Sequence, residues 1–187
     1  GIHTLTDDNG NTVDLILAPY RDRRMIGAPT NTDAIDEISQ NLDDLYSKCS
    51  SKTRIVIGHF MMEKSITGEN PDSFSINELI LPIKIFSKFE MVVMGHVHRH
   101  SVLSKESTIA IYSGSMDKKD FGEKHHEKVA LIVDTDNIKN TEVLKSKTRN
   151  LYEMNLDYTE GDKYFKHQIT DRIILDIDKF NMKYDLE

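Results

Sequence analysis

The sequence predicts an α/β fold in which parallel strands with helical crossovers are followed by antiparallel strands. Short apolar, strand-like runs at residues 13–18, 54–57 and 91–94 alternate with helical patterns at 30–48 and from Pro82 onward. The order strand, helix, strand, helix, strand is typical of a parallel sheet with helical connections. Later strand-like runs follow one another without a helix between them, which favours antiparallel pairing.

The first strand and the first helix have clear boundary signals. Asn9–Gly10 predicts a turn before the first apolar run, and Pro19 ends that run. Apolar residues then recur at three- and four-residue spacing, which is typical of an amphipathic helix; they are Ile35, Ile38, Leu42 and Leu45. We expect Asn31 or Thr32 to cap this helix.

The remaining elements follow from similar signals. The strand at 54–57 leads to Gly58–His59 and to a loop at 61–73 that is rich in helix and strand breakers. The next helix is expected to start near Pro82, because proline is tolerated in a first helical turn and disfavoured in an interior. Further strands are expected at 101–104, 108–115, 128–135, 141–149, 151–158 and 172–179.

Composition bounds the class of protein. A chain of 187 residues with 38% hydrophobic residues can bury one substantial core, so one domain, or one and part of a second, is expected. Its net charge of −7 argues against a uniformly basic nucleic-acid surface, although a local patch or a metal pair could still bind phosphate. Cys49 is the only cysteine, which suits a reducing compartment. No apolar stretch is as long as the roughly 20 residues needed to span a bilayer, so we expect a cytoplasmic protein without a membrane partner.

Two apolar strands end in the same pair of residues, Gly58–His59 and Gly95–His96, and His98 follows the second pair. The carboxyl ends of neighbouring parallel strands face one crevice, so His59 is expected to approach the other two histidines. In an extended segment, residues two apart project to the same face, so His96 and His98 should present their imidazoles together. A single histidine after a strand is more often a solvated loop residue, but the joint pattern favours a metal site formed by His59, His96 and His98.

The other histidines fit this pattern less well. His100 continues the alternation, but the strand is expected to have turned there, so it would support the site or face solvent. His125 and His126 lie in a charged loop and are interpreted as solvated. A zinc site formed by His96, His98 and His100 remains an alternative, although it leaves out His59.

The segments "IVIGHF" and "MVVMGHVHRH" resemble the last two motifs, GH and GHxH, of the calcineurin-like metallophosphoesterases. The continuation "IYSGSMDKKDFGEKHHEKVALIV" resembles the SbcD-type DNA-repair exonucleases within that superfamily, and "TRNLYEMNLDY" is similar to the family's exit toward its cap. The resemblance covers about residues 13–158. It implies a partial calcineurin-like sandwich without its N-terminal portion, with 1–150 as the C-terminal part of the phosphoesterase domain. Residues 151–187 would begin a cap or a DNA-binding accessory region.

The resemblance also implies a function. His59 and His96 would bind the second metal ion and His98 the first, with two Mn²⁺ or alternatively Mg²⁺ ions hydrolysing phosphodiester bonds. DNA and an SbcC-type ATPase would be the partners, usually with the nuclease as a homodimer. Arg99 could bind a phosphate, although an ordinary surface arginine is an equal alternative.

One departure from the family is large. The motifs DxH, GDxxD and GNH(D/E), which supply the other ligands and the proton-donating histidine, do not occur in this sequence. Since three neutral imidazoles cannot satisfy two oxygen-preferring ions, we expect those partners upstream of Gly1, on another chain or in a missing segment, and an inactive chain without them. Asp117, Asp120 and Glu123 are alternative sources of carboxylate ligands, but their lysine-rich surroundings favour a solvated loop.

Two further functions remain open. The first is a metallophosphoesterase that acts on nucleotides or another small phosphodiester. The second is a scaffold or interaction protein that kept the fold and lost the metals.

Overall fold

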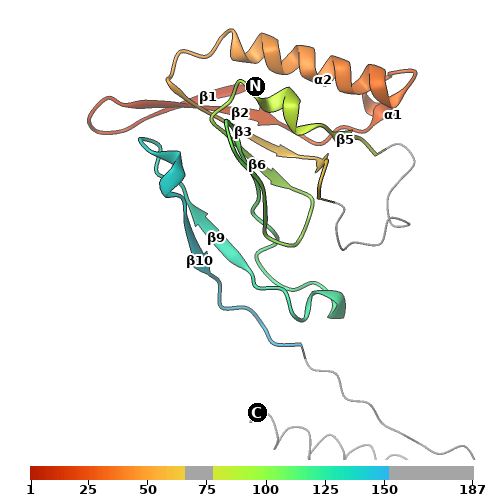
Figure 1. Ribbon diagram of the computed structural model, residues 1–187, viewed down its shortest axis with the longest axis vertical. Coiled ribbons are helices and arrows are strands. Elements are labelled where there is room, and N and C mark those ends of the chain that lie inside the picture. The colour runs from red at the N-terminus through yellow and green to blue at the C-terminus, as the bar shows by residue number, and fades with distance from the viewer. Residues whose placement is uncertain (66–77, 152–187) are drawn as a thin grey trace, which may run out of the picture. The chain divides into compact units, whose positions relative to one another are not determined.

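A computed structural model describes residues 1–65 and 78–151 of the chain, which divides into two compact units, 1–149 and 150–187. The first unit has the expected α/β fold, with a mostly parallel sheet and few helices (Figure 1). The expected strands beyond residue 151 lie outside the described residues, and the assignment of 151–187 to a cap stays a prediction. No helix among the described residues is both long and apolar enough to cross a membrane.

The central sheet has six strands in the order β1-β2-β3-β6-β8-β7. Their bounds are β1 Ile2–Thr6, β2 Thr12–Ala18, β3 Thr53–His59, β6 Met91–Gly95, β7 Ser101–Lys105 and β8 Ile109–Tyr112. The pairs β2–β3, β3–β6 and β6–β8 are parallel, whereas β1 and β7 pair antiparallel at the two edges. The predicted parallel core is therefore confirmed, but β8, expected to be antiparallel, continues it.

Two helices precede β3. The short α1 (Arg23–Ile26) is followed by α2 (Asn31–Tyr46), which confirms the long amphipathic helix. Its N-cap is Thr30, so the expected caps at Asn31 and Thr32 are wrong. Thr30 has an extended backbone, and its hydroxyl accepts a hydrogen bond from the Asp33 backbone N–H while the Asp33 carboxylate accepts one from the Thr30 N–H.

The helix expected near Pro82 is wrong. The segment forms a short strand β5 (Ile80–Leu81), which pairs with β4 (Met61–Met62), and then a single 3₁₀ turn, η2 (Ile83–Phe86). Leu79 and Leu81 are buried while Ile80 between them is 39% exposed. This alternation has the period of a strand, so Pro82 ends an extended segment here.

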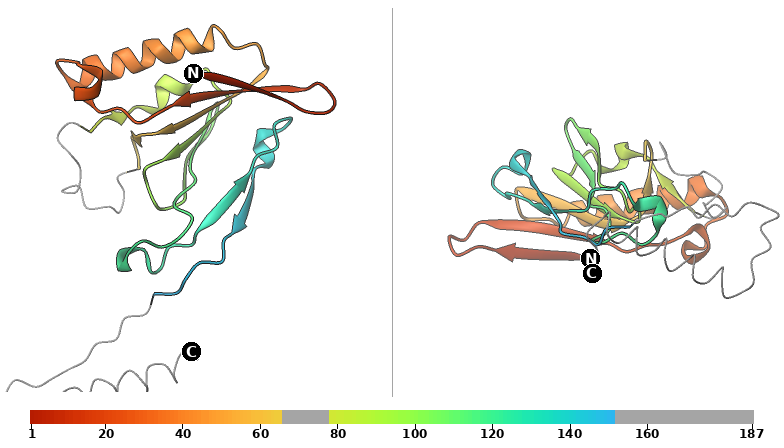
Figure 2. Two further views of the ribbon diagram at one scale, coloured as in Figure 1. Left: turned by 180° about the vertical axis from the view of Figure 1, so that it is seen from behind. Right: turned by 90° about the horizontal axis from the view of Figure 1, so that it is seen from below.

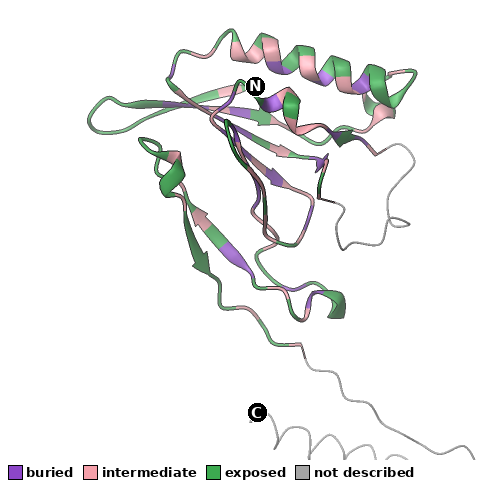
Figure 3. Ribbon diagram, in the orientation of Figure 1, coloured by how far each residue is buried: buried purple, intermediate pink, exposed green. Residues whose placement is uncertain are grey.

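Hydrophobic side chains form one cluster on each face of the sheet. Figure 3 marks in purple the buried residues along the strands. On one face, Val56 and Val92 pack with Ile38 and Leu42 of α2. On the other face lies a hairpin of β9 (Val129–Ile132) and β10 (Glu142–Lys145), visible from behind in Figure 2. Its turn contains η4 (Ile138–Asn140), and η3 (Phe121–Glu123) precedes β9. The second cluster comprises Val13, Ile55, Met91 and Ile111, with Leu131, Val133 and Ile138 packed against it.

Asp14, on β2, is a fully buried carboxylate that ties the first hairpin to the segment before β3. It accepts hydrogen bonds from the Thr4 hydroxyl at 2.6 Å and from the backbone N–H groups of Ser50 and Ser51, each at 2.8 Å. Burial alone would raise the pKa of Asp14, but these hydrogen bonds outweigh burial and lower it.

We expect Asp14→Asn to reduce the free energy of unfolding by about 1–3 kcal/mol, because an amide cannot accept all the bonds made by the carboxylate. The lowered pKa means that the stabilisation is full above the unfolded-state pKa of about 3.9 and is lost as pH falls through the folded-state value. Urea unfolding of both proteins at several pH values should show their difference shrinking below about pH 4. Asp8→Asn, in the exposed turn of the same hairpin, should change stability by less than about 0.5 kcal/mol. Equal stabilities of Asp14→Asn and the unmodified chain at neutral pH would contradict this account.

Candidate metal site

His59 and His96 come together at the carboxyl ends of β3 and β6. The two strands are parallel, and their register pairs His59 with Gly95. The imidazole centroids lie 5.3 Å apart with the rings nearly perpendicular. The convergence predicted from the two Gly-His strand ends is therefore present, while the role of these residues as metal ligands stays a prediction.

Gly95 makes this approach possible. A Cβ at this position would lie 2.8 Å from Nδ1 of His59, closer than real Cβ contacts allow. The absence of a side chain lets the His59 ring lie directly against the end of the neighbouring strand.

The chain turns sharply at His96. Its φ of 92° is unusual for a residue other than glycine, and β6 ends one residue earlier, at Gly95. The extended geometry expected for His96, Val97 and His98 is therefore wrong, because the strand does not continue through them. Backbone conformations of this kind cost free energy and occur preferentially at functional sites.

Two residues that the sequence analysis missed surround His96. Its Nε2 lies 2.5 Å from Oε1 of Glu78, whose side chain is 9% exposed. The ring of Tyr20 stacks on His96 at a centroid distance of 6.3 Å and meets His59 edge-on at 6.1 Å. Burial and then the negative charges of Glu78 and Asp22 raise the pKa of Tyr20, so this phenol stays neutral.

The surroundings of His59 favour its neutral form. Burial lowers its pKa first, and the neighbouring His96, His98 and Lys119 lower it further. A neutral imidazole has a free lone pair, which is the form that binds a metal ion.

His98 has a different environment, built around Glu123. Nδ1 of His98 lies 2.7 Å from Oε1 of Glu123, a carboxylate that also contacts Lys128. Burial alone would raise the pKa of Glu123, but hydrogen bonds from Lys128 and His98 outweigh it and lower the pKa to about 2. The prediction that Asp117, Asp120 and Glu123 are solvated is wrong for Glu123, which is only 6% exposed. It is confirmed for Asp117 and Asp120, which are exposed.

The remaining predicted residues lie beside the site. Nδ1 of His100 is 2.8 Å from the carbonyl oxygen of Tyr112, so this ring is anchored to β8. Arg99 is exposed and lines a hollow of about 440 Å³ together with His100, His125 and His126. Its phosphate-binding role stays a prediction.

The donors near the histidines are too few for the expected pair of metal ions. Within residues 1–65 and 78–151, no three His, Cys, Asp or Glu side chains are arranged to hold a metal ion. The imidazoles of His59 and His96 lie close together, and the Glu78 carboxylate contacts His96, but the three do not form a closed set of ligands. Two oxygen-preferring divalent ions need more carboxylate or water oxygens than these residues provide.

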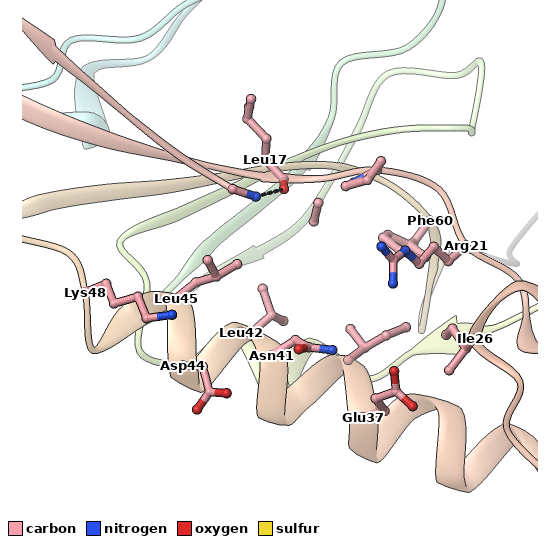
Figure 4. Close-up of a pocket in the computed structure, with 14 residues that line it drawn as sticks. Leu17, Arg21, Ile26, Glu37, Asn41, Leu42, Asp44, Leu45, Lys48 and Phe60 are labelled. Carbon is pink, nitrogen blue, oxygen red and sulfur yellow. Dashed lines mark hydrogen bonds between the residues drawn. The ribbon is translucent and has the colours of Figure 1, made fainter.

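A cavity of about 290 Å³ lies elsewhere, between α2 and the end of β2 (Figure 4). Leu42 and Leu45 of α2 lie on one side of it and Phe60 lies on the other, and charged side chains such as Glu37 border it. Phe60 follows His59 in the chain, but neither His59, His96 nor His98 lines the cavity.

This chain resembles parts of longer chains whose structures are known. No family model matches the sequence. One similar structure is a Staphylococcus aureus protein assigned as a 5′-nucleotidase and solved with alpha-ketoglutarate, with 17% identity and a TM-score of 0.39 over 91% of this chain and 33% of that chain. Another is GAP50, described as the anchor in the inner membrane complex of Plasmodium, with 12% identity and a TM-score of 0.39 over 79% of this chain and 54% of that chain. This chain thus spans about a third and about half of their respective lengths.

We expect Gly95→Ala to push the His59 ring out of its position, because the new methyl group would overlap Nδ1. In the metal-free chain, the pKa of His59 should then rise toward about 6.5, since burial and the nearby His96 no longer lower it. Titration of the imidazole protons by NMR measures this change. Gly122→Ala is the control, because its Cβ would meet only the movable side chain of the exposed Asp120 at 3.0 Å. An unchanged His59 pKa in Gly95→Ala would show that the glycine does not position this ring.

Proposed function

We propose that this chain carries metal-binding loops of a calcineurin-like metallophosphoesterase of the SbcD type, a nuclease that hydrolyses DNA phosphodiester bonds. The observation that supports this proposal most is the meeting of His59 and His96, 5.3 Å apart, at the ends of two adjacent parallel strands. Both strands end in the Gly-His pair that the family resemblance is based on.

The proposed cofactors are two divalent cations, Mn²⁺ or alternatively Mg²⁺. His59 and His96 would contribute to one ion and His98 to the other. A bound pair of such ions supplies Lewis-acid polarisation of phosphoryl oxygens and a water nucleophile at neutral pH. Arg99, exposed beside the histidines, would bind a substrate phosphate through its guanidinium group.

The remaining ligands and the proton donor would come from the family motifs that this sequence lacks. The low number of oxygen donors around the histidines supports this part of the proposal, because the described residues alone do not complete a metal site. Activity would then require those motifs from a longer polypeptide or a second chain.

We propose DNA as the substrate, an SbcC-type ATPase as the partner and a homodimer as the assembly. These three follow from the resemblance of the "SGS" and "FGE" segments to SbcD-type nucleases. Glu123, the acidic residue of "FGE", supports His98, which links this segment to the site. With a net charge of −7, DNA binding would depend on local groups such as Arg99 and would weaken steeply with added salt.

A non-catalytic scaffold is the second candidate, because it would equally account for the incomplete donor set among the described residues. An enzyme that acts on small phosphodiesters is distinguished from a nuclease by its substrate preference. The rates of hydrolysis of DNA, a nucleotide and a chromogenic phosphodiester should be compared at equal metal concentration.

In the complete protein, His98→Ala should reduce manganese-dependent cleavage of DNA by more than about 100-fold, because it removes a direct ligand, whereas loss of an outer-shell partner alone costs 10–100-fold. His3→Ala, which changes an exposed histidine on β1, should leave cleavage unchanged. Nuclease assays on a labelled duplex measure both variants. Full activity of His98→Ala would remove this residue from the site, and inactivity of the unmodified protein with every substrate and metal would favour the scaffold.

The isolated 187-residue chain should bind Mn²⁺ weakly and with less than one ion per chain, because its described donors are too few for a closed site. Metal analysis after dialysis against Mn²⁺, with a titration followed by calorimetry, measures this. Tight binding of two ions per chain would contradict the view that further ligands are needed.

A further inference from the structure

Lys128 is a buried lysine at the base of the loop that carries His98. Its side chain is 1% exposed, and its ammonium donates to three oxygens. They are the carbonyl oxygen of His98 at 2.9 Å, the hydroxyl of Ser115 at 2.7 Å and Oε2 of Glu123 at 2.7 Å. Since an ammonium group has three donors, all of them are used here.

Glu123 connects this lysine to the imidazole of the same histidine. Its Oε2 accepts from Lys128 and from the backbone N–H of Lys119, and its Oε1 lies 2.7 Å from Nδ1 of His98. The contacts form a closed ring in which Lys128 holds the His98 backbone directly and the His98 side chain through Glu123.

The opposite side of the loop is fixed as well. The backbone N–H of Ser115 donates to the carbonyl oxygen of His98 at 3.1 Å. Gly114 has a φ of 83°, and a Cβ there would lie 2.9 Å from the backbone nitrogen of His100. The loop therefore packs tightly against the turn after β8.

A buried ion pair is weak evidence for stability, because desolvation of the two charges can exceed their attraction. The chain offers a comparison in Glu127 and Lys145, which form a 2.6 Å ion pair with side chains 69% and 74% exposed. The buried pair differs from this exposed pair in that its hydrogen bonds converge on one histidine.

We propose that Lys128 and Glu123 are positioning residues that hold the His98 ring with Nδ1 protonated and directed at Glu123, so that the lone pair of the uncharged ring lies on Nε2. A carboxylate only accepts hydrogen bonds, so the nitrogen that faces Glu123 must carry the proton. The His98 side chain is 40% exposed, which leaves part of the ring accessible to a ligand. The tautomer assignment does not depend on any metal. The further statement that Nε2 binds a divalent cation rests on the proposed function.

The tautomer can be measured directly in the full metal-free chain by long-range proton–nitrogen NMR of His98. The unmodified chain should show Nδ1 protonated. The double variant Glu123→Leu/Lys128→Met replaces the buried pair by apolar side chains of similar volume, which avoids an unpaired charge. In it, the proton should no longer be confined to Nδ1.

Two further variants separate positioning from a general structural effect. Glu123→Gln/Lys128→Met restores an oxygen acceptor without charge and should return His98 to the Nδ1–H form. Glu127→Leu/Lys145→Met removes the exposed pair of the same residue types and should leave the tautomer unchanged. An Nε2–H tautomer in the unmodified chain would overturn the proposal, and this result does not depend on any variant folding. An unchanged tautomer in the folded Glu123→Leu/Lys128→Met chain would overturn it too.

Binding of Co²⁺, followed by its visible absorption in the complete protein, tests the link to the proposed function. Loss of the Glu123–Lys128 pair should weaken binding about 10–100-fold. If the unmodified protein binds no cation while the tautomer responds as expected, the metal function fails and the positioning role stands. If cations bind but the tautomer does not respond, the positioning role fails alone.

Discussion

The register between β3 and β6 is the constraint on which the candidate site depends. Parallel strands direct their carboxyl ends to the same edge of a sheet, and the pairing of His59 with Gly95 sets the two Gly-His ends side by side. A shift by one residue would turn the side chains of a strand to the opposite face and separate the rings. Buried residues on both sides of the sheet, such as Val56 and Met91, oppose such a shift, so the core itself fixes the geometry of the site.

Two carboxylates act on the two histidines of the GHxH segment in different ways. Glu78 contacts Nε2 of His96, whereas Glu123 contacts Nδ1 of His98. A cation that binds His96 through Nε2 must therefore share Glu78 or displace it. A cation that binds His98 through Nε2 would meet no such competition from Glu123, because Glu123 contacts the other ring nitrogen.

Sequence reasoning found the elements whose signals are local and periodic. The helix α2 has regular apolar spacing, and the Gly-His pairs stand at the ends of apolar runs, so both were predictable. Glu123 and Lys128 were not, because charged residues in a lysine-rich segment are normally solvated, and only the folded chain brings them to His98. Glu78 has no such signal for another reason: the sequence predicts a helix from Pro82, whereas the chain forms the short strand β5 there, and Glu78 lies just before that strand.

The balance of charge around the histidines limits what the described residues can bind. Lys128 cancels the charge of Glu123, so this pair orients His98 without attracting a cation. Glu78 brings one negative charge and the neutral His59 brings none, while Lys119 opposes positive charge near His59. Two divalent cations at close range repel each other strongly and require several carboxylates to offset that repulsion. If the histidines form one side of a metal centre as proposed, the negative charge that such a centre needs must come from other groups.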